Sequence, residues 1–400
     1  MSVGIDVSKE KSMVCMVRPY GELIHSPYEI EHTESGLNDL CEKILSYGEE
    51  VRVVLEATSA YHFPVVARLQ EAGIFVCVCN PLVMKRYAAT ALRKGKTDKL
   101  DSVRIANYGV ENWFNLTQYQ PLDEVYEELR LLGRQYAHYI TIKVESKLAL
   151  DNLLDRVMPG IKKLLSSNRS DEPTKDKLSD FVERYWHFDN IRKMSETGFK
   201  EDYCAWAKEK GYRRNQSKAE AIYQMACDGI PTLSSSISST EMLLLEAVRI
   251  LRETNRTLQN ILSQMEEIAT GLPEYQTVRG MPGVGGVLSV RLIAEIGDVR
   301  RFHSGSALIA YCGIDAPPFQ SGGFTGTQRR ISKRGSSLLR KTGYEVMKCL
   351  KATKPKTDTA VYDFMLKKEA EGKPKKVAKI AALNKFLRIY YARVKEVYLS

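Results

Sequence analysis

Four carboxylates in the first 101 residues have the types and spacing needed to hold divalent cations. Asp6 and Glu56 each stand at the end of a short apolar segment, and Asp98 and Asp101 lie three residues apart where a helix is predicted to begin. Hard cations such as Mg²⁺ take oxygen ligands, and a pair of them can flank a phosphate during cleavage. Singly, each acid has a simpler explanation, Asp98 as a helix cap and Glu56 as a solvated strand end. Jointly, they predict metal-assisted phosphodiester chemistry.

A second candidate for chemistry is Ser321, which lies in a glycine-rich loop. Gly322 and Gly323 leave room beside the hydroxyl for a bulky phosphate. Serine needs activation and charge neutralisation to attack a phosphodiester, and the nearest histidine in sequence is His303. Basic residues that could neutralise charge follow closely: Arg329, Arg330, Lys333 and Arg334. Because a serine next to glycines is usually an ordinary loop residue, these residues alone leave its role open.

The segment 280–286 reads Gly-Met-Pro-Gly-Val-Gly-Gly and joins a short predicted helix to an amphipathic run. A Pro-Gly-x-Gly turn between helices is typical of a helix-hairpin-helix element. Gly283 and Gly285 would let the backbone approach a phosphate, and the next helix offers free N–H groups at its positive end. Such contacts position nucleic acid without reading its sequence. The alternative is a tight interhelical turn with no ligand.

The elements that would position the acids alternate between strand and helix over the first 112 residues. The apolar patterns predict strands and helices in the order strand 3–7, strand 12–18, strand 22–30, helix 37–45, strand 51–55, a helix through 65–69 and strand 74–78. Three early strands followed by alternating helix and strand is the order of a ribonuclease H-like domain. Residues at the carboxyl ends of strands in an open sheet face the ligand crevice, where Asp6 and Glu56 are therefore expected.

From about residue 122 the hydrophobic period becomes helical. Apolar residues step by four and three from Val125 to Val157, and a cleaner heptad seam runs from Leu244 to Met265. Asn255 occupies a core position of that seam, where an amide commonly fixes register or partner number. The two helices predict an extended antiparallel arm, an oligomerisation element or a plain helical subdomain. The polar stretch 166–235 has helical patches and indicates no chemistry.

Composition narrows the class of protein. The 400 residues exceed what one core usually organises, and 44% hydrophobic with 27% charged residues is ordinary for a soluble globular chain. No apolar run approaches the roughly 20 residues of a membrane helix, and no signal-peptide pattern opens the sequence. The eight cysteines include no CxxC pair and the six histidines are scattered. We therefore expect reduced, buried thiols, no zinc site, no membrane association and a cytoplasmic location.

Charge points weakly to a polyanionic partner. The formal net charge is +10, from 59 Lys and Arg against 49 Asp and Glu. The positive charge gathers in the C-terminal third, in runs at 329–335, 351–356 and 373–379. A basic surface of this kind fits either DNA or RNA.

Several segments, taken in order, resemble one known family. Residues 4–9 (Gly-Ile-Asp-Val-Ser-Lys), 55–58 (Leu-Glu-Ala-Thr, followed by Tyr-His) and 96–101 (Lys-Thr-Asp-Lys-Leu-Asp) resemble the N-terminal RuvC-like domain of the insertion sequence 110 family of transposases, which includes the Piv-type DNA invertases. Residues 312–323 and 331–335 resemble its second conserved domain. The resemblance implies that the chain's catalytic set consists of an acidic tetrad and a nucleophilic serine: Asp6, Glu56, Asp98, Asp101 and Ser321.

The expected architecture is α/β plus all-α. It comprises a RuvC-like domain over 1–115, a helical, coiled-coil-like segment over 116–270 with a polar insertion at 166–235, and a small helical domain over 271–400 with a helix-hairpin-helix-like element and a basic tail. The resemblance implies transposition by cutting and rejoining donor and target DNA through a phosphoserine, with Mg²⁺ as cofactor, a role that Mn²⁺ could fill. It also implies an element-encoded noncoding RNA that bridges the two DNAs. We further expect a homo-oligomer, dimer or tetramer, associated with the nucleoid of a bacterium or archaeon.

Two alternatives belong to different classes. The first is a RuvC-like nuclease, such as a Holliday-junction resolvase, in which water attacks and Ser321 is incidental; a covalent protein–DNA adduct would separate the two. The second is a nucleic-acid-binding protein with a retired active site. The retention of all four acids argues against it, because a retired site has no reason to keep them.

Overall fold

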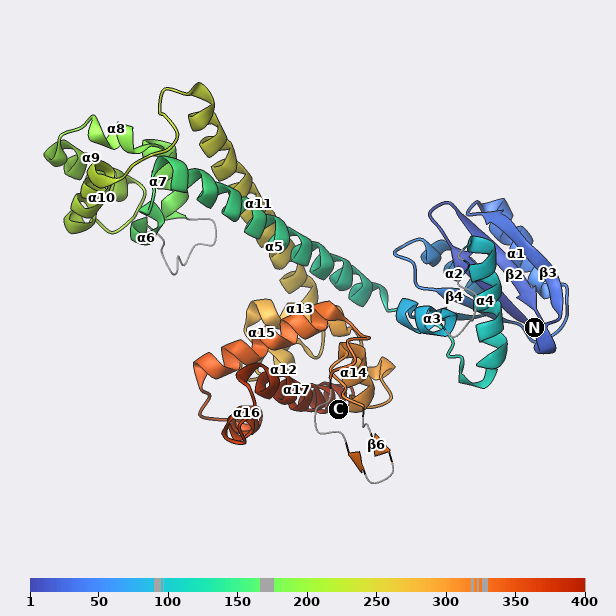
Figure 1. Cartoon of the computed structure of the whole chain (residues 1–400). Helices are drawn as coiled ribbons and strands as arrows, with labels where there is room; N and C mark the ends of the chain where they lie inside the picture. Colours follow the sequence, from blue (N-terminus) through green and yellow to red (C-terminus); the bar gives the residue numbers. More distant parts are fainter. Residues whose placement is uncertain are drawn as a thin grey trace. The chain divides into compact units, whose positions relative to one another are not determined.

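The computed structural model describes residues 1–89, 95, 97–165, 176–317, 320–321, 324–325 and 330–399 (Figure 1). The chain divides into two compact units, Met1–Pro121 and Leu122–Ser400. The finer division of the second unit near residue 270 stays a prediction. Each unit is built around its own hydrophobic clusters.

A five-stranded mixed sheet forms the centre of the first unit. Its order is β3-β2-β1-β4-β5, with β2 antiparallel to β1 and β3 while β4 and β5 run parallel to β1. This order and these directions are those of a ribonuclease H-like domain, so that prediction is confirmed. The strand bounds are β1 Ser2–Val7, β2 Lys11–Val17, β3 Leu23–Glu31, β4 Arg52–Glu56 and β5 Phe75–Cys79.

Helices cover both faces of this sheet. On one face, α1 (Glu34–Leu45) and α2 (His62–Glu71) bury the apolar residues that alternate along β1 and β2. On the other lie α3 (Pro81–Ala88) and α4 (Asp98–Glu111). Two short 3-10 turns, Pro19–Gly21 and Trp113–Asn115, complete the unit. The seven elements predicted from the sequence are all present, with ends shifted by at most a few residues.

Helix α4 lies unusually close to β1, and glycines make this possible. A Cβ at Gly4 would come within 2.2 Å of the Ala106 backbone nitrogen, and a Cβ at Gly109 within 2.1 Å of the Ser2 hydroxyl oxygen. The neighbours of Gly4 are backbone atoms, so no larger side chain fits there, whereas at Gly109 the side chains of Ser2 and Val54 would have to shift. Because Asp6 follows Gly4 by two residues, it lies on the same face of β1 and is directed toward α4.

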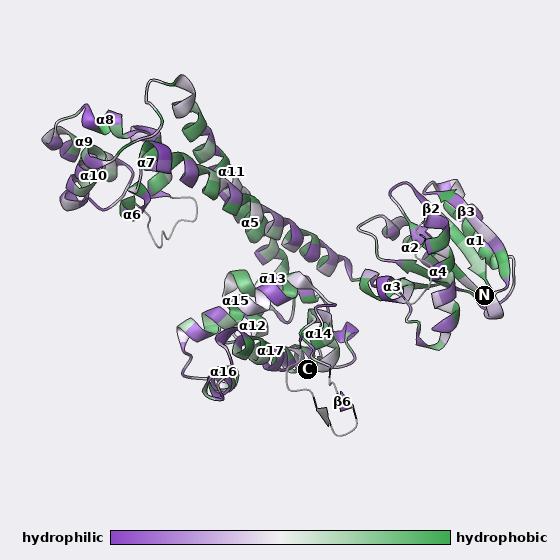
Figure 2. Cartoon of the chain, viewed as in Figure 1, coloured by the Kyte–Doolittle hydropathy of each residue, from purple (hydrophilic) through white to green (hydrophobic). Residues whose placement is uncertain are grey.

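Two long helices, α5 (Glu124–Val157) and α11 (Ser238–Thr270), run side by side in the second unit (Figure 1). Leu129 near the start of α5 packs in one cluster with Met265 near the end of α11, whereas Leu150 packs with Leu251 in another. The helices are therefore antiparallel, and the heptad seam is buried within one chain as an arm. Figure 2 shows hydrophobic and hydrophilic residues interspersed along both helices. The Oδ1 atom of Asn255 is buried and has no hydrogen-bond partner among the residues that the structure describes.

The seam predicts a contrast between two adjacent residues. Leu251 is 5% exposed and Ile250 is 46% exposed. Leu251→Asp should lower the unfolding free energy by about 3 kcal/mol or more, because it buries a charge and removes core packing. Ile250→Asp should leave the melting temperature nearly unchanged. Thermal melting and light scattering of both variants check this. A reduced mass with Leu251→Asp at unchanged stability would instead place the seam between chains.

The far end of the arm carries a small helical subdomain built around aromatic residues. The sequence of 166–235 looked polar, yet the core here contains fully buried rings from Phe181, Tyr185, Phe199 and Tyr203. These rings contact one another with centroids 4.6 to 6.3 Å apart. The bounds are α6 Ile161–Leu165, α7 Lys177–Tyr185, α8 Phe188–Arg192, α9 Glu196–Glu209 and α10 Gln216–Asp228.

The remainder of the second unit is a helical bundle with one short hairpin. Its core combines residues from α13, α14, α15 and α17 with residues from the start of α5 and the end of α11. The hairpin pairs β6 with β7. The bounds are α12 Tyr275–Arg279, α13 Gly286–Ile296, a 3-10 turn at Val299–Arg301, α14 Gly305–Cys312, β6 Gln320–Ser321, β7 Phe324–Thr325, α15 Ser337–Thr353, α16 Ala360–Ala370 and α17 Lys375–Val397.

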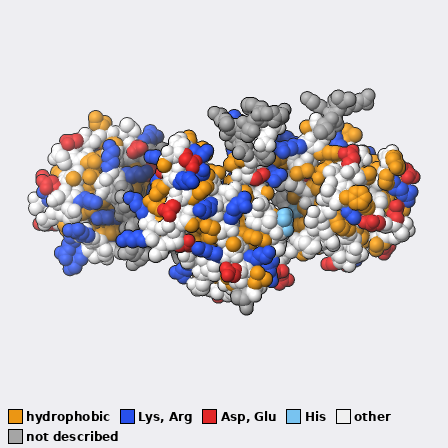
Figure 3. All heavy atoms as spheres, turned by 90° about the horizontal axis from the view of Figure 1, so that it is seen from below, with side chains coloured by type: hydrophobic (Ala, Val, Ile, Leu, Met, Phe, Trp, Pro, Cys, Tyr) orange, Lys and Arg blue, Asp and Glu red, His pale blue; other side chains and the backbone are white. Residues whose placement is uncertain are grey.

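Surface features refine the compositional expectations. Over the described ranges, no helix is long and apolar enough to cross a membrane. All eight cysteines are free, as expected, but Cys227 and Cys349 are exposed rather than buried, because both lie on the solvent side of their helices. Figure 3 shows Lys and Arg side chains scattered over the face drawn, with hydrophobic and acidic side chains among them.

Candidate active site

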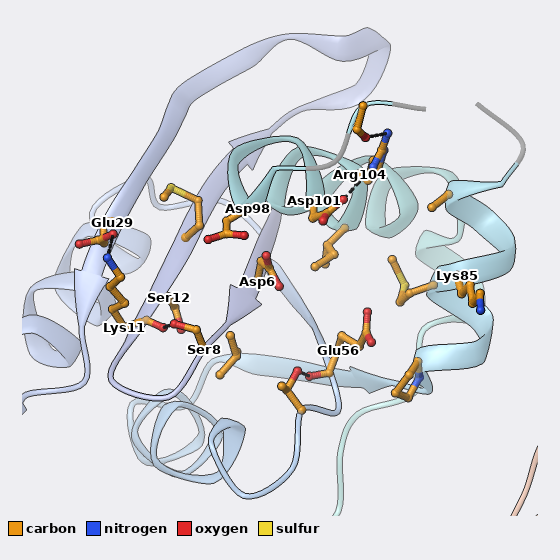
Figure 4. Close-up of a pocket in the computed structure, with 18 of the residues that line it drawn as sticks. Asp6, Ser8, Lys11, Ser12, Glu29, Glu56, Lys85, Asp98, Asp101 and Arg104 are labelled. Carbon is orange, nitrogen blue, oxygen red and sulfur yellow. Dashed lines mark hydrogen bonds and ion pairs between the residues drawn. The ribbon is translucent and has the colours of Figure 1, made fainter. Parts of the chain in front are cut away.

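The four predicted acids line a single cavity of about 770 Å³ in the first unit. Figure 4 shows Asp6, Glu56, Asp98 and Asp101 directed into the same space from β1, β4 and α4. Asp6, Glu56 and Asp101 are half-buried, and Asp98 is exposed. Residues separated by up to 95 positions in sequence are therefore collected by three elements.

The register of the parallel strands brings Asp6 and Glu56 together. Ile5 lies opposite Leu55 in the β1–β4 ladder, so the next pair along is Asp6 and Glu56. Glu56 is the last residue of β4, and neighbouring strands lie about 4.8 Å apart. Both carboxylates consequently stand at the edge of the sheet where ligands bind in folds of this type.

Helix α4 supplies the other two acids from its first turn. Thr97 is the N-cap, and its side-chain oxygen accepts a hydrogen bond from the Leu100 N–H at 3.2 Å. Asp98 is therefore not the cap residue, which removes its simpler explanation. Asp98 and Asp101 share one helical face, and the positive end of the helix favours negative charge there.

Cations that sequence reasoning missed surround this acidic centre. Arg104 donates to Asp101 at 2.7 Å, and Lys11 forms an ion pair with Glu29 at 2.7 Å on the rim. The hydrogen bond to Glu29 raises the pKa of Lys11. Lys85 of α3 also lines the cavity. Arg104 follows Asp101 by three residues on a helix, a spacing that would have indicated the pair.

The chemistry of the donors fits a hard divalent cation, although the carboxylates are not drawn together around one. Oxygen ligands on three elements are what Mg²⁺ or Mn²⁺ requires. Within the described part of the chain, no three His, Cys, Asp or Glu side chains are gathered closely enough to hold a metal ion. Asp101 is paired with Arg104 at 2.7 Å, on the same helix.

A thiol next to the centre is not a competing ligand. Cys79 lies opposite Glu56 in the β4–β5 ladder, and its Sγ is 3.9 Å from that of Cys77. The hydrogen bond with Cys77 and burial both raise the pKa of Cys79. Cys79 is not among the residues that line the cavity, whereas the four carboxylates are, so the lining offers oxygen donors.

Ser321 lies in the second unit, at the end of β6. Its backbone pairs with Phe324 across the hairpin, and Gln320 pairs with Thr325. The chain enters and leaves this hairpin through a hydrogen-bonded base, in which the Ser332 N–H donates to the Asp315 carbonyl at 2.8 Å and the Lys333 N–H donates to the Gly313 carbonyl at 2.9 Å. The base holds the ends of the serine loop together.

The basic residues predicted beside Ser321 flank this base. Arg330 and Lys333 are exposed, while Arg334 is bound to Asp315 at 3.1 Å. Lys333 has a φ of 54°, a left-handed conformation that is uncommon for a lysine. Arg329 lies outside the described residues. Two exposed cations are thus available close to the loop that carries the serine.

The glycine turn before α13 serves packing at one position and leaves another open. Gly283 has a φ of 80°, and a Cβ there would come within 2.9 Å of the Leu350 backbone nitrogen on α15. Close helix packing explains this glycine without a phosphate. Gly285 has open space beside it and precedes α13 without a side-chain cap, so the N–H groups of that helix end are available. The helix-hairpin-helix prediction stays untested.

Two family models match the chain. The first, described as "Transposase", matches residues 3–159, and the second, described as "Transposase IS116/IS110/IS902 family", matches residues 275–362. The matched regions include the acidic cavity in the first case and the serine hairpin in the second. Together they extend over more than half of the chain.

Curated relatives cover most of the chain at low identity. An insertion element IS116 uncharacterized 44.8 kDa protein of Streptomyces clavuligerus is 23% identical, over 84% of this chain and 81% of its own. A pilin gene-inverting protein of Moraxella lacunata is 22% identical, over 98% and 95%. A transposase for insertion sequence element IS1111A of Coxiella burnetii is 32% identical, over 19% and 21%.

Among solved structures, Thermus thermophilus RuvC with a Holliday-junction substrate covers 28% of this chain and 94% of its own, at 13% identity and a TM-score of 0.23. The assignment therefore rests on the two family models, the full-length relatives and the sheet topology. The chain belongs to the insertion sequence 110 family of transposases, enzymes that cut and rejoin DNA.

Proposed function

We propose that this transposase exchanges DNA strands with the acidic tetrad and Ser321 as its catalytic groups. The observation that supports it most directly is the convergence of Asp6, Glu56, Asp98 and Asp101 on one cavity. A divalent cation, Mg²⁺ or Mn²⁺, held by these carboxylates would supply charge neutralisation and activation at a phosphodiester. The four acids would hold and orient it.

In this proposal Ser321 forms a covalent bond with DNA. The hydroxyl gives up its proton to solvent, Oγ bonds to phosphorus, and the bond from phosphorus to a deoxyribose oxygen breaks as that oxygen takes up a proton. Attack by another deoxyribose hydroxyl then releases the serine and joins the new strand. The phosphoserine conserves the energy of the original bond, so rejoining needs no ATP. The exposed Arg330 and Lys333 would bind the phosphates on either side.

The proposal extends to the partners of the reaction. The donor and target DNA would be selected by an element-encoded noncoding RNA, and the active form would be a homo-oligomer, dimer or tetramer, acting at the nucleoid. The net charge of +10 and the basic runs of the C-terminal third support a polyanionic partner such as DNA or RNA. The protein groups assigned here bind phosphates, which carry no sequence information. An RNA would provide that information by base pairing.

The experiment is recombination between two plasmids that carry the element's junction and its target. We expect joined products only when the protein, Mg²⁺ and RNA transcribed from the noncoding DNA next to the gene are all present. Ribonuclease treatment should abolish joining, and fresh RNA should restore it. A scrambled RNA of equal length is the control for nonspecific charge effects. Full joining by ribonuclease-treated protein would contradict RNA guidance, while chelation without effect would contradict metal use.

A further inference from the structure

Arg104 connects two parts of the cavity wall through its guanidinium. Its Nη1 donates to Asp101 Oδ1 at 2.7 Å and its Nη2 donates to the Gly95 carbonyl at 2.7 Å (Figure 4). The Arg104 and Asp101 side chains are 21% and 27% exposed, so the pair is sheltered from water more than a surface ion pair. A planar guanidinium with two bound acceptors has a fixed orientation.

This arrangement uses one oxygen of Asp101 and leaves the other facing the cavity. Oδ1 accepts from Arg104, whereas Oδ2 has no hydrogen-bond partner among the described residues. Carboxylates that bind metals are commonly held in this way by an outer partner, which fixes the ligand's orientation. Since Arg104 is itself anchored on the Gly95 carbonyl, Asp101 is held from outside the cavity.

We infer that Arg104 is a positioning residue that orients Asp101 for binding a divalent cation. The inference rests on the proposed function, because it assumes that the tetrad binds the cation. If Arg104 acted through its charge alone, its removal would change the affinity for the cation in the opposite direction. A guanidinium near the site repels a cation, so its removal would tighten binding, whereas loss of orientation would weaken it. The direction of the change in affinity therefore distinguishes the two roles.

The test is Mn²⁺ binding to the full-length chain, measured by calorimetry and by electron paramagnetic resonance, together with Mg²⁺ titration of DNA cleavage. Arg104→Ala should weaken Mn²⁺ binding about 10- to 100-fold, the range typical of outer partners of metal ligands. The Mg²⁺ concentration for half-maximal cleavage should rise by a similar factor. Cleavage at saturating Mg²⁺ should approach the wild-type rate. Arg104→Lys can donate to only one of the two acceptors, Asp101 Oδ1 or the Gly95 carbonyl. Its Mn²⁺ affinity should therefore lie between that of Arg104→Ala and that of the wild type.

Lys85→Ala is the matched control. Lys85 also lines the cavity as a cation, but it forms no ion pair in the described structure. Its removal should leave Mn²⁺ affinity unchanged or tighter. Melting curves establish that each variant is folded, and Arg104→Lys keeps the test informative if Arg104→Ala is not. Unchanged or tighter Mn²⁺ binding by folded Arg104 variants would overturn the inference. If the wild-type protein shows no Mn²⁺ binding that is lost in Asp6→Ala, the proposed metal site itself is overturned.

Discussion

Asp6→Ala and Glu56→Gln should each reduce DNA strand cleavage by about 10³-fold while leaving DNA retention nearly unchanged. A bound metal contributes several kcal/mol to a phosphoryl-transfer transition state, and each 1.36 kcal/mol is a factor of ten in rate. Both residues stand where β1 and β4 end at the cavity, and their substitution removes carboxylates rather than basic side chains that would bind phosphates. Cleavage of a labelled element end, beside a filter-binding assay, measures the two properties separately.

The matched control is Glu29→Gln, which changes another carboxylate lining the same cavity. Glu29 is 48% exposed and already paired with Lys11, so it is not one of the proposed ligands. Its loss should have only a small effect on cleavage. A second readout is stability: Mg²⁺ should raise the melting temperature of the wild type and not that of Asp6→Ala, because a ligand stabilises only a fold that binds it. Wild-type cleavage by Asp6→Ala would remove the tetrad from the mechanism.

The N-terminal unit was predictable because its signals are local and strong. Short apolar segments mark β1 to β5, and the acids fall at strand ends or in a helix's first turn. Asp6 and Glu56 follow from the rule that the carboxyl ends of parallel strands share an edge. The packing of α4 on β1 depends on Gly4 and Gly109, and single glycines in a sequence do not reveal which backbone will approach them.

The subdomain at the end of the arm was not predictable in the same way. Its aromatic residues are separated by charged ones, so the window 166–235 looks polar, although Phe181 and Tyr203 are fully buried. Each short helix contributes only a few apolar residues, and these form a core only when the helices pack together in the folded chain. Arg104 was missed for a different reason, because an arginine near an acid on a helix is usually a surface pair. Only the shared contact with Gly95 distinguishes it.

The glycine turn shows how one motif can have two causes. The sequence offered phosphate binding or a tight turn, and the structure gives Gly283 a packing reason against Leu350 on α15. Gly285 has no such neighbour, and its helix end is uncapped. The phosphate hypothesis therefore depends on Gly285 and the N–H groups of α13, and no longer on Gly283.

Ser321→Ala should lose recombination by at least about 10⁴-fold, since the loss of a nucleophilic serine in another enzyme costs roughly 10⁶-fold in rate. The wild-type protein, incubated with a nicked substrate that traps the intermediate, should become covalently joined to DNA, and digestion should map the adduct to the peptide containing Ser321. The variant should bind DNA normally and give no adduct. Ser321→Cys should keep at most a trace, because a thiolate is also nucleophilic but places a larger sulfur differently.

The control is Ser337→Ala, which removes the hydroxyl of an exposed serine at the start of α15 in the same unit and should keep both adduct and recombination. The Asp6 and Glu56 variants should lose the adduct as well, because the proposed reaction needs the tetrad for serine attack. This coupling separates the serine mechanism from a water-using nuclease, which would give free cleaved ends, no adduct and near-normal cutting by Ser321→Ala. Efficient cutting by that variant would end the serine mechanism and leave the assignment of the acidic cavity intact, since Asp6 and Glu56 would still be required.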